Sequence, residues 1–378
     1  MTSAIIAAVT PAVEQLLAKG VRIPAPDQIY VDDAVDLARI AAGSVLHPGT
    51  RLVGARTYVA AGAQVGTEGP ATLDGAVLGA GAQVASGYVQ RAVLLRGAKL
   101  GGNAHVRDGT LLEEEASTAH AVGLKCTILL SYVTLGSLIN FCDVLMAGGT
   151  SRRDHSEVGS GFIHFNFTPW GAQGDKATPS LLGDVVHGVL LDQPRIFVGG
   201  SGGMVGPRRV GYGSIVAAGQ VLRRDVEAGR LVLDAPRKSE GPVQAPSGAR
   251  NERVVGHNAA FIAQLVALRQ WYREVRLARI PAGAEHDDAR VVTGEAVAAI
   301  ETCLDERWTR LAAFVAEHGH TAVRPDLAVA ASCPLALPPG GDHLGWVRGL
   351  APDHRDQLRG WLQQIADDIA ARVTAALA

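Results

Sequence analysis

The sequence predicts a mainly β protein, a left-handed parallel β-helix with an N-terminal cap helix and a C-terminal α-helical region. The main observation is a strict six-residue spacing of apolar positions, several followed closely by Gly or Ala, at Val198, Met204, Val210, Val216 and Leu222. Three such hexads make one triangular coil, in which the apolar residue points inward and the small residue allows the turn. The 45 glycines and the aromatic content of 5% suit the narrow interior of such a coil.

The same register recurs over roughly 180 residues, which is a strong signal for a solenoid. The further runs are Ile40, Leu46 and Leu52; Val59 and Val65; Leu78 and Val84; Leu94, Leu100, Val106, Leu112 and Thr118; Leu129, Leu135 and Phe141; and Val158 and His164. Interruptions of the register are expected to be loops extruded at the corners. We therefore expect the β-helix to span residues 40–233, with inserted loops at 146–197.

A helical pattern precedes the predicted solenoid. Residues 2–20 carry an apolar stripe that begins at Ile5 and Ile6 and ends at Lys19. The first coil would otherwise expose its core, so residues 1–39 are expected to cap it.

A second helical pattern follows the predicted solenoid. Residues 234–251 are rich in Pro and Gly and are expected to form a linker. Beyond them the apolar period becomes 3.6, so residues 252–378 are expected to form an α-helical region. We expect three helices there. The first ends near Arg279, the second runs from Thr293 to His318, and the third begins at Pro352.

Composition limits the functional classes. The net charge is −2, from 35 basic and 37 acidic residues, so no global field favours a nucleic acid or an acidic membrane. The N-terminus lacks a signal-peptide pattern, and no apolar run approaches a transmembrane length. The four cysteines form no CxxC pair, which indicates reduced thiols and no metal site. We expect a soluble cytoplasmic protein.

The unusual polar side chains lie in the segment that breaks the repeat, where rigid scaffolds extrude functional loops. Arg152 and Arg153 are candidate phosphate ligands, or else form a solvated corner. His155 and Glu157 would share one face of a strand, as in a general base oriented by a carboxylate. His164 occupies an inward hexad position and is either a second candidate base or a buried core histidine. The spacing of the histidines matches no zinc site.

The hexads and several short stretches resemble the left-handed β-helix acyltransferases. The order of segments is most similar to the acetyltransferase half of the family of bifunctional N-acetylglucosamine-1-phosphate uridylyltransferase/glucosamine-1-phosphate acetyltransferase. The stretch GLKCTILLSYVTLG resembles a lysine-bearing coil of that family, which implies that Lys125 is a sugar-phosphate ligand. Asn166-Phe167 resembles the Asn-Tyr pair of its extruded loop, and Lys176 its loop lysine.

The resemblance extends to the final coils, IFVGGSGGMVGPRRVGYGSIVAAGQVLRRDV. It implies that acetyl-CoA, as co-substrate, binds at Ala217, Ala218 and Arg223 or Arg224. No segment before residue 40 resembles the nucleotide loop of the uridylyltransferase domain, so no nucleotidyltransferase activity is expected.

The chain departs from the family at the catalytic histidine. That histidine lies two residues before a Ser-Tyr or Thr-Tyr pair, but here Leu129 precedes Ser131-Tyr132, and counting back from Asn166 gives Asp143. His155 or His164 would have to replace it.

The resulting hypothesis is a homotrimeric transferase that moves an acetyl or other acyl group from acyl-CoA to an amine of a sugar phosphate or nucleotide sugar. The donor would lie between neighbouring prisms, and backbone N–H groups at 200–203 would face the oxyanion. The alternatives are a non-catalytic sugar-nucleotide-binding or scaffold protein, or a different transferase chemistry that uses the loops Trp170–Lys176 and Val185–Arg195. No metal, nucleic-acid or membrane partner is predicted.

Overall fold

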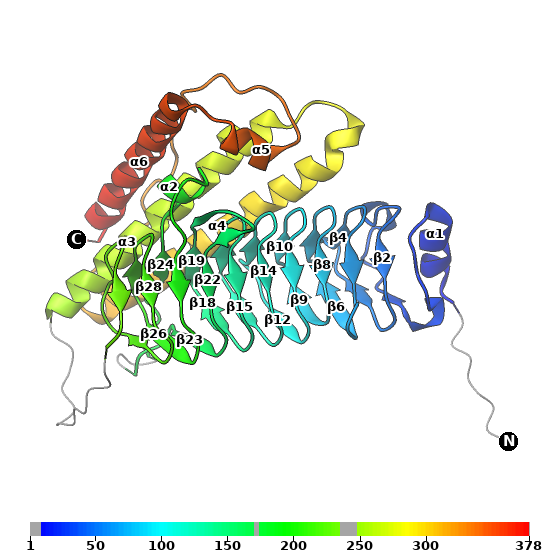
Figure 1. Cartoon of the computed structure of the whole chain (residues 1–378), viewed down its shortest axis with the longest axis horizontal. Helices are drawn as coiled ribbons and strands as arrows, with labels where there is room; N and C mark the ends of the chain where they lie inside the picture. Colours follow the sequence, from blue (N-terminus) through cyan, green and yellow to red (C-terminus); the bar gives the residue numbers. More distant parts are fainter. Residues whose placement is uncertain (1–8, 170–173, 235–247, 378) are drawn as a thin grey trace.

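The computed structural model describes residues 9–169, 174–234 and 248–377. The chain forms a parallel β-solenoid with a short helix at one end and a group of helices along one side (Figure 1). The predicted solenoid with its two helical additions is confirmed.

Three sheets run the length of the solenoid, and all of their strand pairs are parallel. Sheet A contains β2 (Val45–Leu46), β5 (Gln64–Val65), β8 (Gln83–Val84), β11 (Lys99–Leu100), β14 (Ser117–Thr118), β17 (Thr134–Leu135), β22 (Glu157–Val158), β25 (Phe197–Val198), β28 (Ile215–Val216) and β30 (Leu231–Val232). Sheet B contains β1 (Tyr30–Val31), β3 (Arg51–Val53), β6 (Ala71–Asp74), β9 (Gly87–Gln90), β12 (Ala104–Val106), β15 (Gly123–Lys125), β18 (Asn140–Cys142), β23 (Phe162–Phe165), β26 (Gly202–Val205) and β29 (Val221–Leu222). Sheet C contains β4 (Tyr58–Val59), β7 (Val77–Leu78), β10 (Val93–Leu94), β13 (Leu111–Leu112), β16 (Ile128–Leu129), β19 (Val144–Met146), β24 (Ser180–Leu182) and β27 (Arg209–Val210).

The inward column of each sheet consists of the predicted hexad residues. Val198, Met204 and Val210 lie on β25, β26 and β27, one in each sheet, and all are buried. Because side chains alternate along a strand, one residue per short strand enters the prism and its neighbour faces out. His164 belongs to this column, since it pairs in register with Met204.

The small residues allow adjacent coils to stack closely. A Cβ atom added to Gly199 would lie 2.3 Å from the backbone nitrogen of Ala218 in the next coil. The glycines that follow hexad residues are therefore needed for close approach of the backbone as well as for turning.

The predicted cap is helix α1 (Pro11–Lys19), which lies over the first coil (Figure 1). Its Val13 and Leu16 are fully buried in the solenoid core. The Ile5 and Ile6 of the predicted stripe lie outside the described residues. Coiling begins before the first clear hexad, because Arg22 already bridges to Val45.

The C-terminal region is helical, as predicted. It contains α3 (Gly248–Gln270), which continues as the π-helical segment η3 (Trp271–Leu277), then η4 (Ala284–His286), α4 (Asp287–Glu317), α5 (His343–Arg348) and α6 (Pro352–Ala375). Shorter elements are the 3-10 turns η1 (Pro26–Gln28) and η2 (Leu37–Arg39), the helix α2 (Val185–Gly188) and the antiparallel hairpin of β20 (Gly149–Ser151) and β21 (Asp154–His155). Among the described residues, no helix combines the length and the apolar character needed to cross a membrane.

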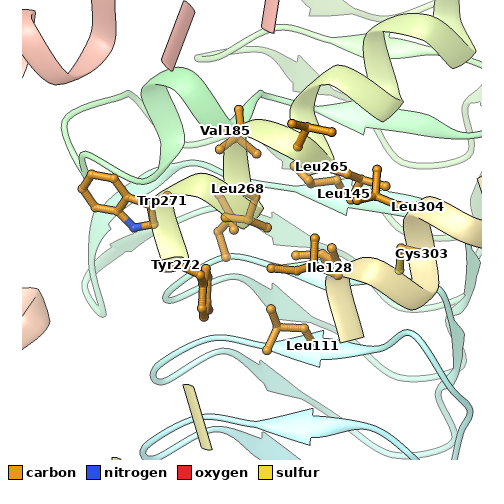
Figure 2. Packing of buried hydrophobic residues seen from close by; sticks show 14 of the residues in the cluster. Leu111, Ile128, Leu145, Val185, Leu265, Leu268, Trp271, Tyr272, Cys303 and Leu304 are labelled. Carbon is orange, nitrogen blue, oxygen red and sulfur yellow. The ribbon is translucent and has the colours of Figure 1, made fainter. Parts of the chain in front are cut away.

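The helices cover the outward face of sheet C. The outward residues of this sheet, such as Leu111, Ile128 and Leu145, are apolar and pack against residues of α3 and α4, including Leu268 and Leu304 (Figure 2). A sheet that is apolar on both faces must be covered on both. The helical region is therefore part of one folded body with the solenoid.

A buried charge cluster also joins the two parts. Arg276 of η3 forms ion pairs with Glu113 and Glu114 at a solenoid corner, and the Tyr272 hydroxyl donates to Glu113 at 2.8 Å. Burial raises the pKa of Glu113, although the nearby guanidinium opposes this. These polar contacts fix the register of η3 against the coils.

Candidate functional site

A pocket of about 480 Å³ opens where sheet B turns into sheet C, against helix α4. It brings together four residues that the sequence singled out, Lys125, His164, Asn166 and Lys176. Its full lining is Arg107, Lys125, Asn140, Cys142, Asp143, Ile163, His164, Phe165, Asn166, Phe167, Lys176, Glu306 and Arg310.

The stacking of coils brings these residues together. Lys125 at the end of β15 pairs with Cys142 at the end of β18, and Asn140 of β18 pairs with Ile163 of β23. Residues at equivalent positions of adjacent coils therefore lie ~4.8 Å apart, although they are separated by a whole coil in sequence. The loop after β23 then brings Asn166 to the same mouth.

Glu306 lies between two cations at the wall of the pocket. Its Oε1 is 3.2 Å from Lys125 Nζ and 3.1 Å from an Arg310 guanidinium nitrogen. Burial tends to raise the pKa of Glu306, but Lys125 and Arg310 outweigh it and lower the pKa overall. In the same way, Glu306 outweighs desolvation and raises the pKa of Lys125. Both groups are therefore charged at neutral pH.

Asp143 and Arg307 form a buried pair behind the pocket. An Arg307 guanidinium nitrogen lies 3.1 Å from Asp143 Oδ1, at ion-pair distance but without hydrogen-bond alignment. The same guanidinium donates to the Lys176 carbonyl at 3.2 Å, and Asn166 Nδ2 donates to the other Asp143 oxygen at 3.5 Å. Burial raises the pKa of Asp143 in spite of the guanidinium. Arg307 thus holds together the two chain segments that form the rim.

His164 is fixed by bonds at both ring nitrogens. Nδ1 lies 2.7 Å from the Cys142 carbonyl, so it carries the proton and donates. Nε2, 2.8 Å from Ser180 Oγ, then accepts from that hydroxyl. Burial lowers the pKa of His164 to about 4, so the ring is neutral at pH 7. This environment is that of a buried, hydrogen-bonded core histidine at the edge of the pocket.

The hairpin β20–β21 and β22 place the other predicted residues elsewhere. His155 Nε2 lies 3.7 Å from Glu157 Oε2, so the expected pair is present, but neither residue lines the pocket. Burial lowers the pKa of His155. Arg152 donates to the carbonyls of Glu115 and Tyr132, at 2.6 and 2.8 Å, while Arg153 is exposed. The Arg152 guanidinium therefore ties the hairpin to the backbone at two corners of the solenoid.

The residues expected to receive acetyl-CoA lie on the last coils, away from the pocket lining. Ala217 and Ala218 follow β28, and Ala218 is exposed. Arg223 and Arg224 are exposed, and Arg224 pairs with Asp234 at 3.1 Å. The structure thus separates these residues from Lys125 and its neighbours within one chain.

The backbone N–H groups expected to face an oxyanion are largely used by the fold. Those of Ser201, Gly202 and Gly203 donate to carbonyls of neighbouring coils. The loop Trp170–Lys176 lies partly outside the described residues. In the loop Val185–Arg195, Val185 and Val186 are buried, and the His187 ring is 2.9 Å from Asp184, so the segment packs as part of the core.

Sequence reasoning missed the residues that α4 supplies. Glu306 and Arg310 line the pocket and Arg307 lies behind it, and all three are more than 120 residues distant in sequence from the lining residues that the solenoid supplies. Their only sequence signal is a glutamate and an arginine at helical spacing, which normally indicates a solvated ion pair. The described residues contain no cluster of three metal-ligating side chains.

No family model matches the chain. The chain is 30% identical over 221 residues to the bifunctional protein GlmU of Kineococcus radiotolerans, which covers 58% of this chain and 40% of that protein. The corresponding protein of Clavibacter sepedonicus is 31% identical over 58% of this chain and 39% of its own length. The corresponding protein of Thermus thermophilus is 31% identical over 59% of this chain and 43% of its own length. The chain thus spans less than half the length of these curated relatives. The resemblance read from the sequence is confirmed: the chain is a parallel β-solenoid protein similar to the proteins named GlmU.

Proposed function

We propose that the protein binds a sugar phosphate or nucleotide sugar in the Lys125 pocket and transfers an acyl group from acyl-CoA to an amine of that ligand. The observation that carries the binding step is the charge of the lining. Among the described residues, the lining of the pocket contains four cationic residues, Arg107, Lys125, Lys176 and Arg310, and two carboxylates, Asp143 and Glu306. An anionic ligand is favoured there.

The remaining lining suits the rest of such a ligand. Asn166 presents amide groups that can bond to hydroxyls. Phe165 and Phe167 are 44% and 53% exposed at the rim, where aromatic faces can cover a sugar or a base. A volume of about 480 Å³ lies within the usual range for small-molecule sites.

The transfer step requires a base and a donor site. The base that takes the proton of the attacking amine would be His164, once the bond from the Ser180 hydroxyl to its Nε2 opens, or His155 with Glu157, which lie outside the pocket lining. The donor would lie along the last coils near Ala217 and Arg224, in a groove between copies of a homotrimer. Arg152 and Arg153 would then lie near that assembly surface.

A second candidate is binding without transfer. It is favoured by the pair of Asp143 and Arg307, because counting back from Asn166 gives Asp143 where the resembling family has its catalytic histidine. Both Asp143 carboxylate oxygens already have partners, Arg307 at Oδ1 and Asn166 at Oδ2, so the carboxylate faces these groups and not an attacking amine.

The test is titration calorimetry of the full chain with glucosamine-1-phosphate, UDP-N-acetylglucosamine and acetyl-CoA. Lys125→Ala should weaken binding of the phosphorylated ligands about 10-fold or more, because a charge-assisted contact contributes about 1.5–3 kcal/mol. Lys99→Ala is the matched control, since Lys99 is exposed on β11 of sheet A.

Thiol release from acetyl-CoA separates the candidates. Release that depends on an amino-sugar phosphate supports transfer, and tight binding without release supports the second candidate. Failure of every phosphorylated ligand to bind would refute both.

A further inference from the structure

Helix α4 forms one wall of the pocket. Glu306 and Arg310 line it, and Arg307, on the same helix, lies buried behind it. The opposite wall comes from β15, β18 and β23 of the solenoid. All of these elements belong to one chain.

The wall is held in place by contacts to both parts of the solenoid rim. Arg307 joins the Asp143 corner to the Lys176 carbonyl. Asn258 of α3, which is fully buried, donates to the adjacent Ala177 carbonyl at 3.0 Å. The loop that carries Lys176 is therefore fixed by two C-terminal helices.

The side chain of Arg310 is positioned for a ligand. Two of its guanidinium nitrogens bond to Glu306 at 3.1 and 3.2 Å, and this carboxylate also holds Lys125. The Arg310 side chain is 35% exposed, so part of its donor fork is open to the pocket. A guanidinium and an ammonium side by side form a site for a phosphate group.

We propose that α4 completes the ligand pocket within a single chain, with Arg310 as a direct contact to the phosphate of the ligand. This inference rests on the proposed binding function and extends it. It assigns a ligand contact to the C-terminal helical region, and it makes phosphate binding independent of a neighbouring copy even where the chain assembles.

The first test compares Arg310→Ala with Arg372→Ala, using glucosamine-1-phosphate and UDP-N-acetylglucosamine as probes. Arg372 of α6 makes a similar ion pair with a carboxylate four residues earlier, but it lies outside the pocket lining. Arg310→Ala should weaken the binding of both probes about 10-fold or more. Arg310→Lys should recover part of the lost affinity. Arg372→Ala should bind both probes as the original protein does. Circular dichroism confirms that each variant is folded.

The second test decides whether the pocket lies within one chain. Lys125→Ala and Arg310→Ala chains, with different tags, are produced in one cell and purified through both tags, and their mass is measured by light scattering. A pocket within one chain leaves every site defective in the mixture. If the two chains do not co-purify, binding of the probes by the original protein as a monomer also supports the proposal.

Other results would overturn it. A pocket shared between copies would restore about one third of the sites in a mixed trimer, since one of its three interfaces joins an intact Lys125 half to an intact Arg310 half. If Arg310→Ala binds both probes as the original protein does, Arg310 makes no contact with the phosphate and this inference fails, whereas the proposed function still stands. If the original protein binds neither probe, the proposed function fails, and this inference fails with it.

Discussion

Arg307 of α4 neutralises Asp143, a residue at a solenoid corner that lies more than 160 positions earlier in the chain. Both side chains are almost completely buried, at 1% and 7% exposure. The pair therefore ties the helical region to the coil that forms the pocket, and each charge depends on the other for compensation.

Arg307→Met should destabilise the protein by about 3–5 kcal/mol, because it leaves the Asp143 carboxylate buried without a counter-charge. Burial already raises the pKa of Asp143, so the folded state binds its proton more readily than the unfolded state does. Stability in the variant should thus fall as the pH rises above the ordinary range of an aspartate. Urea denaturation at pH 5 and pH 7 should show the larger deficit at pH 7.

The double variant Asp143→Leu/Arg307→Met is the control for this result. Because the double variant has no buried charge that needs a counter-charge, it should lose less free energy of unfolding than Arg307→Met alone does. A double variant that is as unstable as the sum of the two single variants would contradict the interpretation.

The burial of His164 as a neutral ring predicts that the protein loses stability in acid. The unfolded chain binds a proton at the ordinary histidine pKa of about 6.5, whereas burial holds the pKa in the folded state at about 4. This difference in pKa contributes about 3 kcal/mol to the free energy of unfolding. The contribution is complete above pH 6.5 and is lost as the pH falls towards 4. Denaturation of the original protein and of His164→Gln at pH 7 and pH 4.5 measures it.

The difference between the two pH values is the readout, because His164→Gln also changes the packing of the core. The original protein should lose about 2–3 kcal/mol more than the variant over this interval. His320→Gln, at an exposed site after α4, should behave as the original protein does. Equal slopes for all three proteins would show that His164 is not a buried neutral group.

The hexads predicted the solenoid because its core repeats locally: one inward residue per strand is visible in the sequence itself. The covering of sheet C had a weaker signal. The middle strands of this sheet carry two consecutive apolar residues, such as Leu111 and Leu112. The nearby strands β8 and β11 of sheet A instead carry a polar residue and one apolar residue, such as Gln83 and Val84. Only the outward apolar residue indicates that helices pack there.

The candidate site was predicted in part, and the reason lies in sequence distance. Lys125, Asn166 and Lys176 were found because short stretches around them resemble a known family, and the solenoid brings them together. Arg310 has no such local pattern. Its approach depends on how a distant helix packs, which a single sequence does not show.

Arg152 and Arg153 offer a test of a structural against a surface role. Arg152 donates to two corner carbonyls through partly buried bonds, whereas its neighbour is exposed. Arg152→Ala should cost about 1–3 kcal/mol of stability, since carbonyls lose their partner. Arg153→Ala should change stability by less than about 0.5 kcal/mol. Thermal unfolding of both variants provides the comparison, and equal melting temperatures would exclude the structural role of Arg152.

The close approach of coils predicts an asymmetry between glycines. Gly199→Ala would place a methyl group 2.3 Å from the Ala218 nitrogen, so the adjacent coils must separate locally. Such overpacking typically costs about 1–3 kcal/mol. In contrast, Gly294 lies within α4 with nothing within 4 Å of an added Cβ. Gly294→Ala should therefore stabilise the protein by about 0.5–1 kcal/mol through the better helix propensity of alanine.

Differential scanning calorimetry of the two variants tests both signs at once. The same chemical change should lower the melting temperature at the coil position and raise it at the helix position. If both substitutions raised it, the stacking of Gly199 on Ala218 would be looser than the structure shows. The last coils, where we propose that acyl-CoA binds, would then lack the close packing that excludes larger residues there.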